Sequence, residues 1–557
     1  MTSTATPTDN WTKRSVVSSF IMKTEHGSPR VALFQRSDRV STYQHHWGPI
    51  SGTISRSDPT PLAAAWREMA EETTLTPASL SLLRQGKPFT FRDASVRREW
   101  TIFPFLFQLK HEPHEHQQEQ QKQIQTDWEH EAWAWHDPDA VIRGDASTGS
   151  NSGNLRGVPR LAESLRRVWF ENDLGPAGAG KILAEGLDVL GRDHESGARQ
   201  LAGVALQVFR DVVARMDGSA AGAEGEGVQD WWAKVRFAAW HLWKNGRESM
   251  GAAILSALLA ALARVEQVMQ QKTDRGTLCE KVRSELNAQI AERQDSATRI
   301  SQAFVAYLEK TFASKRASHE PICILTLSES STIRQGLRDA TEAGFALDLR
   351  ILESRPLYEG VSLGGSLTTD LTTTAAPTIE PPPKPPPHSI TIYTDASAAL
   401  ASSNIDLLVL GADRIAASGA VSNKTGSLPA ALSAKHASPT AQVVVLGESD
   451  KIAPPGRAED HVVEDNDASQ VSRAWRAEYN SQRVRDAAST TIHQDGQGSR
   501  NGDSRAVKLA IRNIFFEWVP ASLVDTYVME SGEWTTEEIA QHSAELEAEE
   551  KRLFGSL

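Results

Sequence analysis

Short apolar runs in the N-terminal part of the chain predict strands around a single helix. The runs cover residues 15–22, 30–34 and 100–108, and residues 61–72 have the spacing of an amphipathic helix. A tract rich in Gln, His and Glu over residues 111–125 is expected to be a solvated loop. We therefore expect a mixed α/β unit at this end of the chain.

The pattern becomes helical after a linker rich in Ser, Gly and Asn. Between about residues 158 and 316, apolar residues recur at every third and fourth position, for example over 231–243 and 252–269. The longest apolar segment, residues 250–263, ends at a charged arginine and is too short to span a bilayer. We expect it to be a buried helix.

From about residue 321, apolar strands alternate with helical segments. This order predicts a parallel sheet covered by helices on both faces. The predicted strands are residues 322–327, 346–352, 390–393, 405–410, 443–446 and 523–529. Residues 368–388, with their proline run, and the polar residues 489–503 are expected to be surface excursions from this sheet.

These changes of pattern predict an α/β multidomain protein with five segments. The expected segments are 12–142 as a mixed α/β sandwich, 143–196 as a linker and helical connection, 197–316 as a helical subdomain, 317–540 as a Rossmann-like sheet domain and 541–557 as a C-terminal helix or tail.

Composition narrows the class of protein. The chain has 557 residues, of which 39% are hydrophobic and 23% charged, with a net charge of -12. The acidic balance argues against sequence-independent nucleic-acid binding, which depends on clustered Lys and Arg. Cys279 and Cys323 are the only cysteines, and no secretory signal opens the chain, so we expect a cytoplasmic protein without a disulfide framework or a membrane segment.

Three glutamates are crowded on the predicted N-terminal helix. Helical spacing places Glu68 and Glu72 on one face with Glu71 beside them. Such carboxylates repel one another unless a hard cation neutralises them, and Mg²⁺ or Mn²⁺ takes oxygen ligands of this kind. The alternative is a solvated acidic face without a metal.

This stretch resembles the Nudix box of nucleoside-diphosphate-linked hydrolases. Gly52 opens the motif and residues 67–72, Arg-Glu-Met-Ala-Glu-Glu, match its centre. The spacing is one residue too long, so the first acid of the motif is expected at Asp58 or Pro59, and Thr74 replaces its second glycine. The resemblance implies that Glu68, Glu71 and Glu72 are metal ligands and catalytic residues for hydrolysis of a diphosphate.

The C-terminal sheet carries the second candidate site. Asp413 follows an apolar strand, and Asn423 and Lys424 precede a helix, which is the layout of a site for a phosphorylated ligand. Arg355, after another strand, has a guanidinium group that suits a phosphate. The alternative is that Asp413 and Arg414 only pair and cap a turn.

Residues 197–540 resemble the superfamily of initiation factor 2B regulatory subunits, ribose-1,5-bisphosphate isomerase and methylthioribose-1-phosphate isomerase. The resemblance depends on Glu-Ser-Arg-Pro at 353–356, Gly-Ala-Asp-Arg-Ile at 411–415 and Phe-Glu-Trp-Val-Pro at 516–520. It implies that Asp413 is one member of a Cys and Asp proton-transfer pair. Ser328 occupies the expected position of the cysteine, and serine is a poor proton donor and acceptor.

Other candidate residues have competing interpretations. His111, His114 and His116 could bind a metal or belong to a polar loop. Glu99 is either an extra metal ligand or part of a surface ion pair. Cys323 could replace the missing thiol, although its position on a strand favours the core.

Two functions fit these patterns. The first is a fused enzyme, in which a diphosphate hydrolase releases a sugar phosphate that the C-terminal region binds or isomerises. The second is a regulatory module, similar to initiation factor subunits, that senses a phosphorylated metabolite without turnover. In both, we expect small-molecule diphosphate and sugar-phosphate ligands and a homo-oligomer formed through the C-terminal region.

Overall fold

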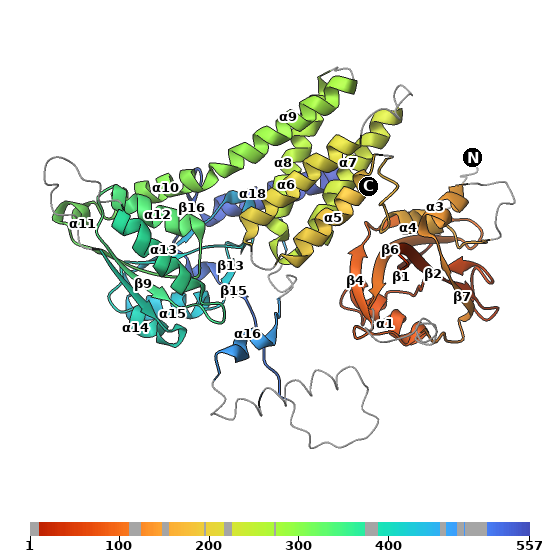
Figure 1. Cartoon of the computed structure of the whole chain (residues 1–557), viewed down its shortest axis with the longest axis horizontal. Coiled ribbons are helices and arrows are strands. Elements are labelled where there is room, and N and C mark those ends of the chain that lie inside the picture. The colour runs from red at the N-terminus through yellow and green to blue at the C-terminus, as the bar shows by residue number, and fades with distance from the viewer. Residues whose placement is uncertain are drawn as a thin grey trace, which may run out of the picture.

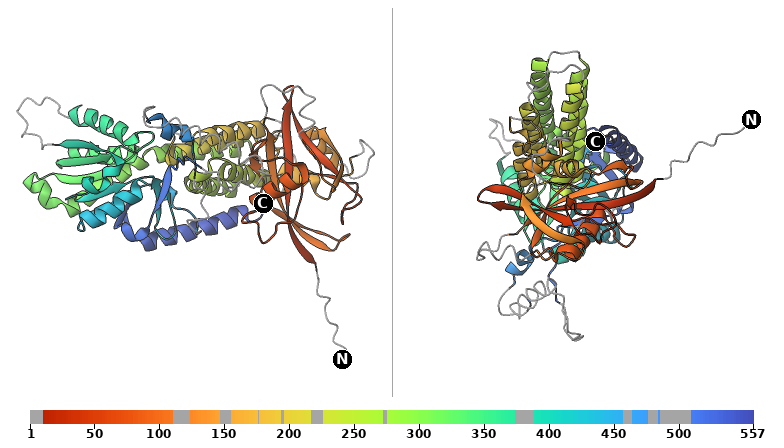
Figure 2. Two further views of the ribbon diagram at one scale, coloured as in Figure 1. Left: turned by 90° about the horizontal axis from the view of Figure 1, so that it is seen from below. Right: turned by 90° about the vertical axis from the view of Figure 1, so that its right-hand side faces the viewer.

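The computed structural model describes most of the chain as three successive bodies. The described residues are 11–110, 124–146, 155–175, 177–193, 196–216, 226–271, 275–373, 388–456, 464–475, 484 and 509–557. An N-terminal sheet unit, a helical bundle and a larger sheet unit follow one another along the long axis of the molecule (Figures 1 and 2).

A seven-stranded sheet forms the centre of the N-terminal unit. Its strands are β1 (Thr12–Glu25), β2 (Ser28–Arg36), β3 (Trp47–Gly48), β4 (Leu80–Gln85), β5 (Phe89–Asp93), β6 (Arg98–Leu109) and β7 (His130–His136). The order is β3-β2-β1-β6-β4, with β5 paired to β6 and β7 to β2. The strands predicted over 15–22, 30–34 and 100–108 are therefore present as β1, β2 and β6.

Alternate residues of these strands face two different helical layers. Val17 and Ile21 of β1 pack with Ala65 and Met69 of α1 (Pro61–Thr73). Phe20 and Met22 pack on the opposite face against α3 (Pro138–Ala146) and α4 (Leu161–Arg166). This period of two is what a strand buried on both faces requires.

The central body is a bundle of long helices. Its helices are α5 (Ala179–Arg192), α6 (Ala198–Arg215), α7 (Glu226–Asn245), α8 (Gly251–Gln270) and α9 (Arg275–Gln294). The C-terminal helix α18 (Thr536–Phe554) packs against the bundle core through Leu546, Leu553 and Phe554. The boundary expected between residues 540 and 541 thus falls inside α18, which links the sheet to the bundle.

The apolar segment around α8 is longer than expected. Among the described residues, 248–270 form the one helix long and apolar enough to cross a membrane, with a mean hydropathy of 1.6. The prediction that the segment is too short is therefore wrong, because the preceding 3₁₀ turn (Glu248–Met250) and the end of α8 extend it. Most of α8 is buried in the bundle, as expected for a core helix.

The C-terminal sheet has the order β10-β9-β8-β11-β14-β16-β17. Its strands are β8 (Ile322–Leu327), β9 (Leu347–Leu352), β10 (Ser389–Tyr393), β11 (Leu407–Leu410), β14 (Gln442–Leu446), β16 (Thr526–Met529) and β17 (Gly532–Trp534). The six predicted strands are present and parallel, while the additional β17 pairs antiparallel to β16.

Helices cover both faces of this sheet, as the alternating pattern predicted. One layer consists of α10 (Ser296–Thr311), α12 (Ser331–Glu342) and α13 (Glu359–Thr373). The other contains α14 (Ala398–Ala401), α15 (Ser427–Ala437) and the start of α18. The remaining elements are α11 (Ala313–Ser318), α16 (Ala468–Arg473), three short 3₁₀ turns (Asp395–Ser397, Ser449–Lys451, Ala521–Leu523) and a small sheet of β12 (Arg414–Ile415), β13 (Val421–Lys424) and β15 (Phe516–Val519).

Candidate functional site

A cavity of about 340 Å³ lies at the carboxyl edge of the parallel sheet. Its walls come from residues that follow β8, β11 and β14, from β13, and from the first residues of α6 and α12. From β8 the chain moves outward through β9 and β10 and then returns to β11 on the other side of β8. Such a reversal opens a crevice between the strand ends, where open α/β sheets bind ligands.

Four of the residues predicted for this site line the cavity: Ser328, Asp413, Asn423 and Lys424. Ser328 follows β8 with φ 66°, in the left-handed region that residues other than glycine rarely adopt. Its backbone N–H donates to the hydroxyl of Ser354 at 2.8 Å. The turn that presents Ser328 is therefore held by the end of the neighbouring strand β9.

Asp413 stands in a cationic environment at the cavity wall. Burial raises the pKa of its carboxyl group, and the ammonium groups of Lys451 and Lys424 oppose that rise. Its neighbour Arg414 is itself buried, which lowers its pKa, and it interacts electrostatically with Glu248. The charges around Asp413 thus favour a ligand site over the simple Asp413 and Arg414 pair.

Asn423 and Lys424 end β13 at the same edge of the cavity. Asn423 is buried, whereas the Lys424 ammonium forms an ion pair with Glu359 at 2.9 Å. The Lys424 ammonium also lies 4.8 Å and 5.0 Å from the ring centroids of Phe515 and Phe516. Two aromatic faces and one carboxylate therefore hold the lysine in place.

Arg355 is not among the residues that line this cavity. Its side chain is 56% exposed and its Nε donates to Glu353 at 2.9 Å. It lines a separate small cleft next to Lys424. Between the end of β9 and Arg355, Ser354 turns the chain with φ 60°. The position of Arg355 in the sequence therefore did not reveal where the Arg355 side chain lies.

Seven charged residues that line the cavity were not predicted from the sequence: Arg199, Arg247, Glu329, Arg334, Glu359, Glu448 and Lys451. Arg199 comes from the start of α6 and Arg247 from the loop before α8, while Glu448 and Lys451 follow β14. Arg247 forms a bidentate pair with Glu464, at 2.9 Å and 3.1 Å. For Glu448 the signal was available, because it follows the apolar strand β14 within two residues, much as Asp413 follows β11 within three.

Cys323 belongs to the core and not to the cavity. It lies on β8, is 8% exposed, and its thiol donates to Asp348 at 3.1 Å. Burial and the Asp348 carboxylate raise the pKa of the thiol to about 12. A thiol this weakly acidic cannot replace the cysteine that Ser328 displaces.

We expect Cys323 to resist alkylation by iodoacetamide in the native protein at pH 8, because the thiolate is the reactive form. The half-buried Cys279 should react first, and both should react after unfolding in guanidinium chloride. Mass spectrometry of the peptides measures the difference. Equal rates at Cys323 in native and unfolded protein would contradict its assignment to the core.

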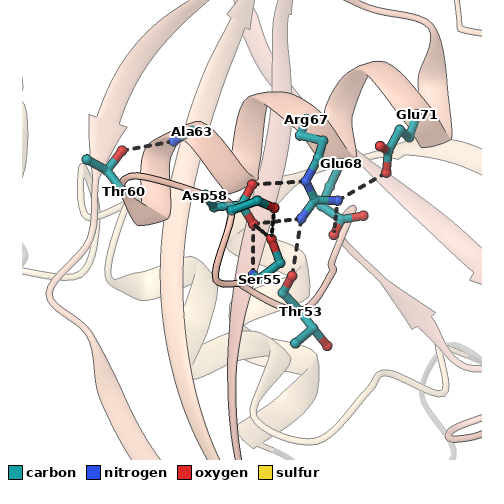
Figure 3. A network of polar contacts seen from close by, with 9 residues as sticks. Thr53, Ser55, Asp58, Thr60, Ala63, Arg67, Glu68 and Glu71 are labelled. Atoms are coloured by element: carbon teal, nitrogen blue, oxygen red, sulfur yellow. Dashed lines mark hydrogen bonds and ion pairs between the residues drawn. The ribbon is translucent and has the colours of Figure 1, made fainter.

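In the N-terminal unit, Arg67 organises the acidic helix (Figure 3). Its guanidinium donates to both carboxylate oxygens of Asp58, at 3.1 Å and 3.0 Å, to Glu68 at 2.8 Å and to Glu71 at 3.1 Å. It also donates to the carbonyl of Thr53 at 3.2 Å. Of the two positions left open by the irregular spacing, Asp58 is therefore the one whose side chain pairs with Arg67.

Glu68 and Glu72 face inward from α1. A Cβ atom on Gly52 would lie 1.9 Å from the Glu68 carboxyl carbon, so the glycine that opens the motif makes room for this side chain. Glu72 is 3% exposed and lies 3.5 Å from His130. Burial raises the pKa of both glutamates, and for Glu72 the carboxylate of Glu129 raises it further.

The three predicted ligands do not converge on one point. Within the described residues, no group of three His, Cys, Asp or Glu side chains is arranged to hold a metal ion. Glu71 is 59% exposed and turned toward Arg67, while Glu68 and Glu72 point inward. The donor set of crowded carboxylate oxygens nevertheless suits a hard cation, because each inward charge repels the next.

A pocket of about 310 Å³ opens beside Glu68. Its walls are rich in aromatic and guanidinium groups, which the sequence analysis did not single out. They are Tyr43, Phe89, Phe91, Trp100, Arg36, Arg98 and Arg160, with Glu129 beside Glu68. Aromatic faces bind planar rings and guanidinium groups bind phosphates, so this pocket can hold both parts of a nucleotide.

One wall of this pocket comes from the chain that leads into the bundle. Val158, Arg160 and Ser164 line it. The backbone around Val158 exchanges hydrogen bonds with Trp47 of β3, including the Val158 N–H to the Trp47 carbonyl at 2.8 Å, and the Ser164 hydroxyl meets that of Ser18 at 2.8 Å. This segment is therefore fixed against the sheet that it follows.

Two alternatives from the sequence have different outcomes. Glu99 pairs with Arg92 at 2.8 Å and with Lys13 at 3.5 Å, which is the surface ion pair and not a metal site. His111, His114 and His116 lie outside the described residues.

Two family models match separate parts of the chain. The NUDIX domain model matches residues 12–154, which contain the acidic helix and most of the aromatic pocket. The initiation factor 2 subunit family model matches residues 387–536, which contain Asp413, Asn423 and Lys424. The chain thus combines a NUDIX domain with a domain of the initiation factor 2 subunit family.

A curated relative matches over a limited length. A Nocardia farcinica protein named probable bifunctional methylthioribose-1-phosphate isomerase/methylthioribulose-1-phosphate dehydratase is 32% identical over 149 residues, which cover 27% of this chain and 24% of that protein. The chain therefore spans about a quarter of that relative's length.

Solved structures of initiation factor 2B match a larger share of the chain at low identity. The translation initiation factor eIF-2B of Pyrococcus horikoshii has a TM-score of 0.40 and 18% identity, covering 64% of this chain and 97% of that one. A chain of the tetrameric eIF2B-beta2-delta2 complex of C. thermophilum has a TM-score of 0.42 and 14% identity, covering 65% and 94%.

Proposed function

We propose that this protein is a fused enzyme. Its NUDIX domain hydrolyses a nucleoside-diphosphate-linked substrate, and its initiation factor 2B-like region binds a sugar phosphate of the kind that such hydrolysis releases. The observation that supports the first part best is the position of the aromatic and guanidinium pocket directly beside Glu68.

In the NUDIX domain, the aromatic side chains Tyr43, Phe91 and Trp100 hold the base, and Arg36 and Arg160 contact the diphosphate. Glu68, Glu71 and Glu72 hold Mg²⁺ or Mn²⁺, which neutralises phosphate charge and activates water when bound. Glu71 turns from Arg67 to do so. The cost is small, because an exposed ion pair contributes only about 0 to 1 kcal/mol.

In the C-terminal cavity, Lys424 and Asn423 bind the phosphate and Asp413 faces the sugar. Arg199, Arg247 and Lys451 add positive charge around the same space, which suits a phosphorylated ligand. The name of the curated relative and the family resemblance suggest three probes: ribose 1-phosphate, ribose 1,5-bisphosphate and methylthioribose 1-phosphate.

The test of the hydrolase uses purified full-length protein with Mg²⁺ and a panel of adenosine, uridine and guanosine diphosphate sugars. We expect a nucleoside monophosphate and a sugar phosphate as products, resolved by ion-exchange chromatography. If none of these compounds is cleaved with Mg²⁺ or Mn²⁺, the hydrolase assignment is wrong.

For the second site, we expect Lys424→Met to weaken binding of the sugar phosphate that wild-type protein binds by about 10-fold to 100-fold. A charged hydrogen bond contributes about 1.5 to 3 kcal/mol. Isothermal titration calorimetry measures the affinity. Lys435→Met is the matched control, because Lys435, on α15, pairs with Asp525 and does not line the cavity. Equal affinities for both variants would contradict the role of Lys424.

A second function is favoured by Ser328, which stands where the isomerases have a cysteine. In that case the C-terminal region is a regulatory, oligomerising module that senses the sugar phosphate without turnover. Light scattering with and without the sugar phosphate tests whether a homo-oligomer forms through this region and responds to the ligand.

A further inference from the structure

Besides the partly buried Asp413, the cavity at the sheet edge contains a second acid, which is fully buried. Glu448 follows β14 at the same edge as Ser328 and Asp413, and it is 3% exposed. Within the described residues, neither of its carboxylate oxygens accepts a well-oriented hydrogen bond. A buried carboxylate whose oxygens accept no well-oriented hydrogen bond costs free energy unless a ligand or reaction uses it.

Cations beside Glu448 keep it ionised. The Lys451 ammonium lies 3.1 Å from one carboxylate oxygen and the Arg199 Nε lies 3.8 Å from the other. Burial alone would raise the pKa of Glu448, but these two charges outweigh burial and hold the pKa below its ordinary value. Glu448 is thus an ionised carboxylate at the wall of the cavity, with a cation beside each of its oxygens.

The pKa of Asp413 shifts in the opposite direction, although the Lys451 ammonium acts on both carboxyl groups. Burial raises the pKa of Asp413 more than the surrounding cations lower it. The pKa values of the two carboxyl groups in this cavity therefore shift in opposite directions. The protonated form of Asp413 is favoured, which suits an acid, and the ionised form of Glu448 is favoured, which suits a base. This division is the usual arrangement of an acid and base pair.

We propose that Glu448 and Asp413 act together as the base and the acid of a proton transfer on an aldose 1-phosphate bound in this cavity. Glu448 takes the role that a cysteine fills in the isomerases that this region resembles. The inference depends on the proposed function only in assuming that a sugar phosphate binds here, and it adds turnover to binding.

The proton transfers balance. Asp413 gives its proton to the ring oxygen as the bond between that oxygen and C1 breaks, which leaves an oxocarbenium ion at C1. Glu448 removes the proton from C2, and the electron pair of that bond becomes the double bond between C1 and C2. The C2 hydroxyl then returns a proton to Asp413 as the ketone forms, while C1 takes the proton held by Glu448. The product is the open ketose phosphate, and both acids return to their initial states.

Three other groups are less suited than Glu448 to the role of the base. The Ser328 hydroxyl is a much weaker acid than a thiol, and Cys323 is held in the core by Asp348. Glu359, which also lines the cavity, pairs at 2.9 Å with the Lys424 ammonium, the group that the proposed function assigns to the phosphate, so it lies at the phosphate end of the cavity.

The experiment compares wild-type protein with Glu448→Gln and Asp413→Asn on ribose 1-phosphate, ribose 1,5-bisphosphate and methylthioribose 1-phosphate. Ketose formation is followed by NMR, and affinity is measured separately by calorimetry. We expect kcat to fall by about 10²-fold to 10⁴-fold in each variant, with less than a threefold change in Kd. Glu342→Gln, on the exposed face of α12, should match wild type.

Glu448→Asp guards against a folding defect, because it keeps the negative charge and moves the carboxylate away by one methylene group. We expect an intermediate kcat and wild-type affinity. If wild-type protein binds none of the probes, both the proposed function and this inference fail. If it binds a probe without forming ketose, or if Glu448→Gln turns over at the wild-type rate, only this inference is overturned.

Discussion

Glu71→Gln should reduce diphosphate hydrolysis by about 10²-fold to 10⁴-fold in kcat, the range expected when a group acting on the reacting atoms is removed. The substitution keeps the shape of the side chain and removes its charge. Glu71 is 59% exposed and forms an ion pair with Arg67 on the same helix. Because such an exposed pair contributes little to stability, the fold should tolerate the change. Product release from the nucleoside-diphosphate sugar that wild-type protein cleaves is the measurement.

Glu131→Gln is the matched control for this prediction. Glu131 is an exposed carboxylate of the same domain, on β7, where it pairs with His45 at 2.9 Å. We expect wild-type hydrolysis from this variant and an unchanged melting temperature from both. Wild-type activity in Glu71→Gln would remove Glu71 from the catalytic machinery.

Phe170→Ala should lower the free energy of unfolding by about 3 to 5 kcal/mol, the cost of removing a fully buried phenylalanine ring. Phe170 is 0% exposed, and its ring packs against His241 at a centroid distance of 4.6 Å and under the Arg84 guanidinium at 4.4 Å. It thereby joins the first sheet to the bundle. The shift of the denaturant midpoint measures the loss, with the transition analysed by domain because a chain of this size need not unfold in two states.

Trp128→Ala is the control for that prediction, since Trp128 is an equally bulky aromatic residue that is 55% exposed. We expect its midpoint to remain close to that of wild type, as for most surface substitutions. If the two variants unfold at the same denaturant concentration, Phe170 does not anchor the junction.

Apolar runs predicted the main strands well because burial on both faces leaves little choice of residue. β8 and β11 are examples, with every residue from Ile322 to Leu327 and from Leu407 to Leu410 buried. The small sheet of β12, β13 and β15 was not predicted. Its strands have only two to four residues, and β13 pairs with β15 over a long sequence distance, so the local pattern does not mark them.

The sequence predicted the site residues that follow individual strands, but not those that other elements bring to the same cavity. Ser328 and Asp413 could be grouped because parallel strands share an edge, and Asn423 belongs to the same sequence motif as Asp413. Arg199 could not be found in this way, because a helix of the bundle brings it to the cavity from a distant part of the sequence. Arg355 was misplaced because one left-handed residue, Ser354, redirects the chain after β9.

The segment from Val158 to Ser164 links the aromatic pocket of the N-terminal unit to the helical bundle. It lies beyond the end of the NUDIX family match, yet it forms one side of the aromatic pocket and leads within a few residues to Phe170 in the bundle core. Connectors between fused enzymes normally accept insertions and can be exchanged. Here we expect a change in connector length to alter the shape of the aromatic pocket, so that the NUDIX domain keeps this pocket in another fusion only if the segment is transferred with it.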